Sequence, residues 1–192
     1  MKLLALRCPE CTHSLKPEND HIVVSCEFCH AAVQIGDEGV TPVPVQYARP
    51  RHEAGVTQWL PFWVFHGRVH VSKRLVAPGK KSRQEEMERL WGEPRHFYVP
   101  AWELSLRRVQ ETSKEMIRRQ PAYQTIAQPA EVRLTPVTLT TEDALKVLEL
   151  IILAIEAQRP DFLERLDFHL EVGEAVLWAL PADDGGTVAL EE

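Results

Sequence analysis

Four cysteines in two closely spaced pairs are the residues of this chain best suited to chemistry. They are Cys8 with Cys11 and Cys26 with Cys29, and they are all the cysteines of the chain. Two thiolates separated by two residues can bind one metal ion from a tight turn, and two such pairs complete a tetrahedral shell of four sulfurs. The spacing therefore predicts one structural Zn²⁺ ion, with iron as the alternative metal.

The residues around the two pairs predict a short β-hairpin that would hold the four sulfurs together. Fourteen residues, 12–25, separate the pairs, and 21–25 is rich in the β-branched side chains that strands favour. The segment 32–35 predicts the strand that leaves the second pair. Thr12 and His30 occupy the position after each pair, where the turn favours a positive φ and therefore glycine.

This layout over residues 8–35 resembles the zinc-ribbon superfamily. The resemblance implies that the metal ligands are the four cysteines and no other residue. The ribbon followed by 60–65, Leu-Pro-Phe-Trp-Val-Phe, is also similar to a loose group of uncharacterised bacterial proteins with an N-terminal ribbon and a proline–aromatic–tryptophan strand. Members of that group often carry transcription-factor-like or helicase-like labels that rest on the ribbon alone, and this chain has no helicase motif.

Other uses of the cysteines would need a different setting. Two disulfides would need an oxidising compartment, and residues 1–7 have too short an apolar stretch for a secretory signal. A redox CxxC pair usually lies between a strand and a helix N-terminus, and the sequence around Cys8 and Cys26 does not predict a helix. His13 and His30 are expected to be surface histidines, with a role as substitute metal ligands as the alternative.

Length and composition predict two domains. The 192 residues are enough for a zinc ribbon over 1–36, a proline-rich linker over 37–48 and an α+β domain over 49–192. With 44% hydrophobic and 26% charged residues, the composition is that of a globular protein and excludes a disordered chain. The longest apolar run, 150–155, is too short to cross a bilayer, so we expect a cytoplasmic protein without a membrane span.

Two aromatic segments, 59–71 and 97–106, begin the second domain with a similar order of aromatic residues, proline and tryptophan. They predict two strands of a possible internal half-repeat, with chance similarity between two core strands as the alternative. The proline in each segment predicts an edge strand or a bulge. His66 and His70 would form a metal-binding pair on a helix, but this segment predicts a strand.

The fold class that these patterns predict is α+β: an N-terminal zinc ribbon followed by a strand-rich domain with one dominant helix. The dominant helix is expected over 141–159, because apolar residues recur there at helical spacing and Thr140 or Thr141 can cap it. Two further helices are expected over 82–92 and 107–120, and two strands over 166–172 and 175–180.

Charge is unevenly distributed along the chain. Residues 49–119 carry a net charge of +7, while 1–48 carry −3 and 120–192 carry −10. The basic region 68–119 could bind phosphate groups, or an acidic surface of a protein partner. The candidate contact residues for nucleic acid or a partner are Lys73, Arg74, Lys80, Lys81, Arg83, Arg107 and Arg108.

The sequence contains little that indicates catalysis. The sequence has no phosphate loop, dinucleotide fingerprint, nucleophile elbow or HExxH motif. A metal closed by four sulfurs also leaves no coordination position for substrate. We therefore expect a non-enzymatic zinc-binding interaction protein, an accessory or assembly subunit of a larger complex with a protein partner. The alternatives are a nucleic-acid-binding ribbon protein that uses 68–119, and a thiol-redox or iron protein.

Overall fold

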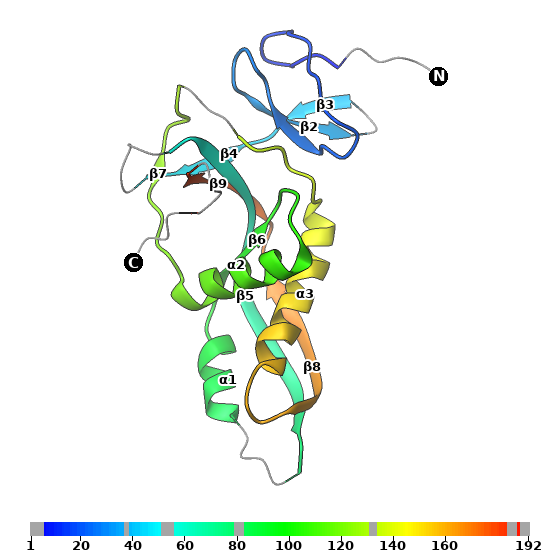
Figure 1. Cartoon of the computed structure of the whole chain (residues 1–192), viewed down its shortest axis with the longest axis vertical. Coiled ribbons are helices and arrows are strands. Elements are labelled where there is room, and N and C mark those ends of the chain that lie inside the picture. The colour runs from blue at the N-terminus through cyan, green and yellow to red at the C-terminus, as the bar shows by residue number, and fades with distance from the viewer. Residues whose placement is uncertain are drawn as a thin grey trace.

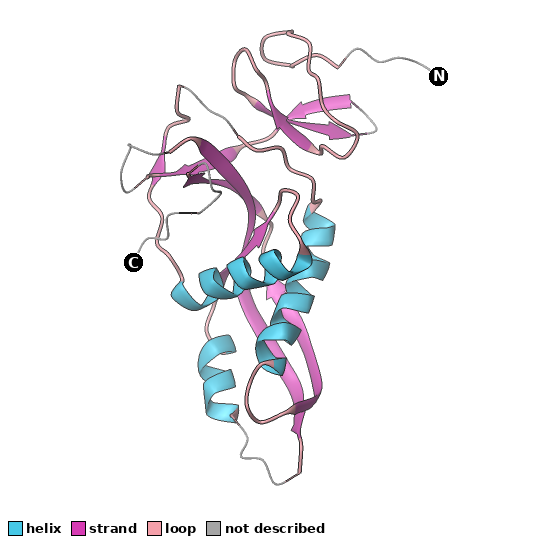
Figure 2. Cartoon of the chain, in the orientation of Figure 1, coloured by secondary structure: helices cyan, strands magenta, loops and turns pink. Residues whose placement is uncertain are grey.

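The structure is a computed structural model. It describes residues 6–36, 39–50, 56–78, 83–130, 134–183 and 188. These residues form an α+β fold with three helices and two sheets (Figure 1, Figure 2). Within these ranges, no helix combines the length and the apolar character that a membrane crossing needs.

The smaller sheet contains the strands predicted around the second cysteine pair. Its order is β1 (Val23–Ser25), β2 (Ala32–Gly36) and β3 (Gly39–Pro42), all antiparallel. β3 lies within the segment predicted as a linker, where it pairs with β2. The next strand, β4 (Val45–Ala48), also comes from that segment but joins the larger sheet. Residues 39–48 therefore pass from one sheet directly into the other.

The larger sheet is built around one long strand, β5 (Gln58–Val76). β6 (Arg95–Pro100) pairs with one edge of β5. The other edge of β5 pairs first with β9 (Val176–Ala182) and, further towards its C-terminal end, with β8 (Leu163–Val172). β4 then runs parallel to β9, and β7 (Thr125–Ile126) completes the order β6-β5-β9-β4-β7. The predicted strands over 166–172 and 175–180 are thus confirmed as β8 and β9.

The two faces of β5 have different neighbours because side chains alternate along a strand. Trp63, Phe65 and Val69 face the main core, which includes residues of α1 (Gln84–Trp91) and α3 (Thr141–Ala157). Leu60, Phe62 and Val64 face a second cluster with Met116 of α2 (Leu106–Arg119). Further along β5 this second face is exposed, since His66 and Arg68 are open to solvent.

Proline does not place β5 at an edge, so that prediction is wrong for this strand. Pro61 lies in a strand with neighbours on both sides. Its carbonyl accepts a hydrogen bond from the Ala101 amide at 3.0 Å, just past the last residue of β6. The Pro61 nitrogen, which cannot donate a hydrogen bond, faces the same side. The Ala101 carbonyl there accepts from the Thr138 amide instead.

The two aromatic segments form neighbouring antiparallel strands of the same larger sheet. Phe62 of β5 pairs with Pro100 of β6, and Phe65 pairs with Phe97. The second segment is a strand only as far as Pro100, because the chain then turns into α2.

The three helices agree with the predicted ones to within two residues at the ends that the structure describes. The Thr140 hydroxyl accepts a hydrogen bond from the Asp143 amide at 3.0 Å, which confirms the predicted cap of α3. α1 begins after Arg83 without a side-chain cap, and Ser82, the first residue of the expected helix, lies outside the described residues.

The ribbon is attached to the larger sheet by the segment 134–138, which we call the strap. The Ile22 amide donates to the Val137 carbonyl at 2.7 Å, and the Val137 amide donates to the Val23 carbonyl at 2.8 Å. At its other end, the Thr135 amide donates to the Trp59 carbonyl at 2.9 Å. Val23 is fully buried in the same core cluster as Trp63, so the ribbon and the larger sheet share a core.

Candidate metal centre

The four cysteine sulfurs lie together in an arrangement that can hold a metal ion. Sγ of Cys8 is 3.6 Å from Sγ of Cys29, and Sγ of Cys11 is 3.5 Å from Sγ of Cys26. All four sulfurs lie within 4.8 Å of one another. Sulfurs bound at about 2.3 Å around a tetrahedral ion would be about 3.8 Å apart. The cysteines are not joined as disulfides, and their spacing is compatible with a shell of four sulfurs around one metal ion.

Two similar backbone turns position the sulfurs. The Thr12 amide donates to the Cys8 carbonyl, and the His30 amide donates to the Cys26 carbonyl, both at 2.9 Å. Thr12 has φ 64° and His30 has φ 61°, the left-handed conformation that the sequence predicted after each pair. The turns bring each cysteine pair to one side, and the β1–β2 pairing fixes the second turn against the rest of the ribbon.

The thiols influence one another's ionisation. Burial opposes ionisation of Cys26, but the backbone amides of Cys29 and Phe28 donate to its sulfur and lower its pKa to about 7. The Ala31 amide lowers the pKa of Cys29, but burial and the three neighbouring sulfurs raise it to about 12. A bound cation would supply the positive charge that lets all four thiols ionise together.

Two histidines next to the cysteines lie outside the ligand group, which contains only the four cysteines among the residues the structure places here. The His13 ring stacks on the Phe28 ring with centroids 3.8 Å apart and an interplanar angle of 7°. The His30 carbonyl accepts a hydrogen bond from Gln128 at 2.6 Å. Both residues therefore have structural partners beside the four-cysteine cluster.

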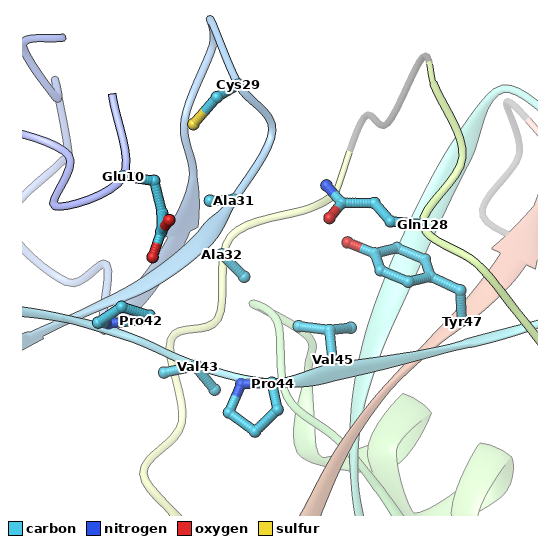
Figure 3. Close-up of a pocket in the computed structure, with 10 residues that line it drawn as sticks. All are labelled: Glu10, Cys29, Ala31, Ala32, Pro42, Val43, Pro44, Val45, Tyr47 and Gln128. Carbon is cyan, nitrogen blue, oxygen red and sulfur yellow. The ribbon is translucent and has the colours of Figure 1, made fainter. Parts of the chain in front are cut away.

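A groove of about 400 Å³ lies beside the four-cysteine cluster and is lined by residues of both the ribbon and the larger sheet (Figure 3). Figure 3 shows Cys29 and Glu10 on the ribbon side and the Tyr47 hydroxyl directed towards Gln128 on the other side. Burial raises the pKa of Tyr47 to about 12, so its hydroxyl stays protonated at neutral pH. The rest of the described lining consists of alanine, valine and proline.

The predicted basic contact residues that the structure describes differ in exposure and in their acidic partners. The prediction that Arg74 is a surface contact is wrong, because its side chain is only 1% exposed and forms ion pairs with Glu156 and Asp161. Arg83 pairs with Glu86 and Arg107 pairs with Glu111, while Lys73 and Arg108 are exposed. Lys80 and Lys81 lie outside the described residues.

A buried ion network around Arg74 is the feature that sequence reasoning missed. Arg74 donates to Glu156 from Nε at 3.0 Å and to both oxygens of Asp161 at 2.7 and 2.9 Å. Glu156 also accepts hydrogen bonds from the Trp91 indole and from Arg159, each at 2.8 Å. The network ties β5 to α1 and α3, which indicates a structural role.

Comparison with protein-family models, curated proteins and solved structures gives no match to this chain.

Proposed function

We propose that the protein is a zinc-binding interaction protein, an accessory or assembly subunit that docks onto a larger complex through its ribbon. The observation that carries this proposal is the combination of a four-sulfur cluster, a strap that bonds the ribbon to the larger sheet, and an exposed aromatic side chain between two of the cysteines. Together they make a rigid element with one prominent contact residue.

Zinc is the metal that suits this centre best. It accepts four thiolates in a tetrahedron, and its binding supplies folding free energy to hairpins too short to be stable alone. β1 has only three residues and β2 only five, so this ribbon needs such a contribution. Four sulfurs fill the coordination shell, and the metal therefore has a structural role in this proposal.

Phe28 is the proposed centre of the docking surface. Its side chain is 64% exposed, the highest value among the large hydrophobic residues in the described ranges. It lies between Cys26 and Cys29 in a turn that the metal would fix, and His13 supports one face of its ring. Rigid aromatic side chains of this kind often dominate the binding free energy of protein interfaces.

The charge of the ribbon favours a protein partner with a basic rim over nucleic acid. Residues 6–36 carry two basic and four acidic side chains. Four thiolates around Zn²⁺ add two further negative charges. A phosphate backbone would be repelled by this surface, whereas an apolar pocket surrounded by lysine or arginine would complement it.

The test is affinity capture from the native host with the zinc-loaded protein and two matched variants. Phe28→Ala should lose a stoichiometric protein partner that the wild-type chain retains at high salt. Phe162→Ala is the control, because Phe162 is also 62% exposed but lies in the turn between α3 and β8, away from the ribbon (Figure 1). Equal capture by both variants would contradict docking through Phe28.

Nucleic-acid binding through 68–119 is the alternative that the same experiment distinguishes. Phosphate contacts weaken steeply with salt, because binding releases condensed counterions. Nucleic acid recovered at low salt and lost at high salt, without a protein partner, would favour this alternative. Colour or reversible thiol oxidation in the purified protein would instead favour the iron or thiol-redox alternative.

A further inference from the structure

Half of the eight histidines of the chain lie on one exposed face of the larger sheet. His66 on β5 pairs directly with His96 on β6, and His70 on β5 pairs directly with His169 on β8. The ring centroids are 4.8 Å apart in the first pair and 4.7 Å in the second. Side chains opposite each other on neighbouring strands are close enough to bind one ligand together.

The His70–His169 pair also has a carboxylate beside it. Nε2 of His70 lies 2.6 Å from Oε2 of Glu171, two residues after His169 on β8. An ionised carboxylate can only accept, so Nε2 of His70 carries the proton of this hydrogen bond. Nδ1 of a neutral His70 ring is then left with a free lone pair. Histidine ligands of metals are commonly oriented by such a carboxylate on the other ring nitrogen.

We propose that His70 and His169 form a second metal site, which binds one divalent late transition-metal ion and is separate from the four-cysteine centre. Glu171 orients the His70 ring and does not itself bind the ion. The two rings are now stacked at an interplanar angle of 10°. Modest rotations about χ2, a broad torsion in histidine, turn one nitrogen of each ring towards a common point. Solvent or a ligand group would complete the coordination shell.

The surrounding charges determine which ions this site accepts. Arg68 lies 3.6 Å from Glu171 and offsets its charge, so the carboxylate beside the two imidazoles is already engaged by Arg68 and His70. Mg²⁺ and Ca²⁺ need several oxygen ligands, whereas Zn²⁺, Ni²⁺ and Cu²⁺ bind imidazole nitrogen well. The site should therefore bind Zn²⁺ or Ni²⁺ and ignore Mg²⁺.

Titration calorimetry of untagged protein that already holds one zinc tests this site. Added Zn²⁺ should bind at one further equivalent, and His169→Ala should abolish this step. Glu171→Gln should weaken it by about tenfold, the usual effect of removing an orienting group. Circular dichroism of each variant checks that the sheet is intact, and Mg²⁺ should give no binding heat.

Two control variants show whether binding is local. His66→Ala removes another exposed histidine from the same strand, and His21→Ala disrupts a group of two exposed acids, Glu18 and Asp20, with the half-buried His21 on the ribbon. Both should retain the second equivalent. The absence of a second equivalent in the wild type, or its loss in either control, would overturn the proposal.

Discussion

Removing Arg74 should destabilise the protein strongly, because Asp161 would stay buried without the cation that pairs with it, while Glu156 would keep its ion pair with Arg159. The side chains of Glu156 and Asp161 are 0% and 1% exposed. Arg74→Met would delete three charge-assisted hydrogen bonds, while the hydrogen bond from the Arg83 amide to Asp161 would remain. Breaking one side of a buried ion pair costs about 3–5 kcal/mol. Urea unfolding at pH 7, followed by circular dichroism, should show a loss of this size.

The pH dependence gives the same prediction a second test. Arg74 holds the pKa of Asp161 at about 2, below its ordinary value of 3.8, although burial acts in the opposite direction. A carboxylate with a depressed pKa stabilises the fold above its unfolded pKa and loses that effect as the pH falls through the folded pKa. Because burial without Arg74 would raise the pKa of Asp161 in the variant, the difference in stability between wild type and Arg74→Met should be full at neutral pH and shrink as the pH falls towards 2. Acid also releases a metal held by thiolates, but from both proteins alike.

Two further variants complete this test. Arg74→Met combined with Asp161→Leu should recover most of the lost stability, because apolar residues then replace both partners. Arg107→Met is the surface control, since Arg107 and Glu111 are both largely exposed, and it should leave the unfolding midpoint nearly unchanged. A loss below about 1 kcal/mol for Arg74→Met, or one that does not vary with pH, would refute the reasoning.

Three other substitutions test the ribbon and the sheet. Cys11→Ser should release the metal and raise amide exchange in the ribbon while the larger sheet stays protected; unchanged metal content would argue against a four-sulfur site. Thr12→Gly should stabilise the metal-bound ribbon by about 1 kcal/mol, because a β-branched residue is strained at φ 64°. Competition with a chelator measures this gain, and weaker metal retention would contradict it. Gly67→Ala would place Cβ 2.0 Å from the Glu171 carbonyl oxygen, so we expect a cost of about 3 kcal/mol or more by thermal unfolding; an unchanged midpoint would exclude this close approach.

The four-cysteine cluster could be predicted from sequence because the pattern that specifies it is local. Each cysteine pair spans four residues, and a short hairpin brings the pairs together without any distant contact. The dominant helix could be predicted for a similar reason, since its cap and its apolar spacing lie within one segment. Patterns over a few residues determine both features.

The buried ion network could not be predicted from local patterns. Arg74 lies among basic residues in the sequence, and its partners Glu156 and Asp161 are 82 and 87 residues away. An irregularity in the β5–β8 pairing between Val71 and Lys73 also changes which face of β5 Arg74 occupies. One clue was present: Glu156 falls on the buried side of α3, one turn after Ile152.

The strap and the exposed sheet face that carries four histidines depend on pairings between distant segments. Val137 pairs with Val23 through a single isolated bridge, which leaves no strand-length pattern in the sequence. His70 meets His169 only because β5 and β8 pair in this register. A shift of one residue would move each side chain to the opposite face, so single-strand patterns do not predict these contacts.

The most direct test of the central claim is the metal content and sulfur coordination of the protein purified without added metal. Mass spectrometry and X-ray absorption should show one zinc per chain with four sulfur neighbours at about 2.3 Å. The proposal of a docking ribbon stabilised by zinc would be contradicted by any of three results: fewer than four sulfur neighbours, iron in place of zinc, or no stoichiometric metal.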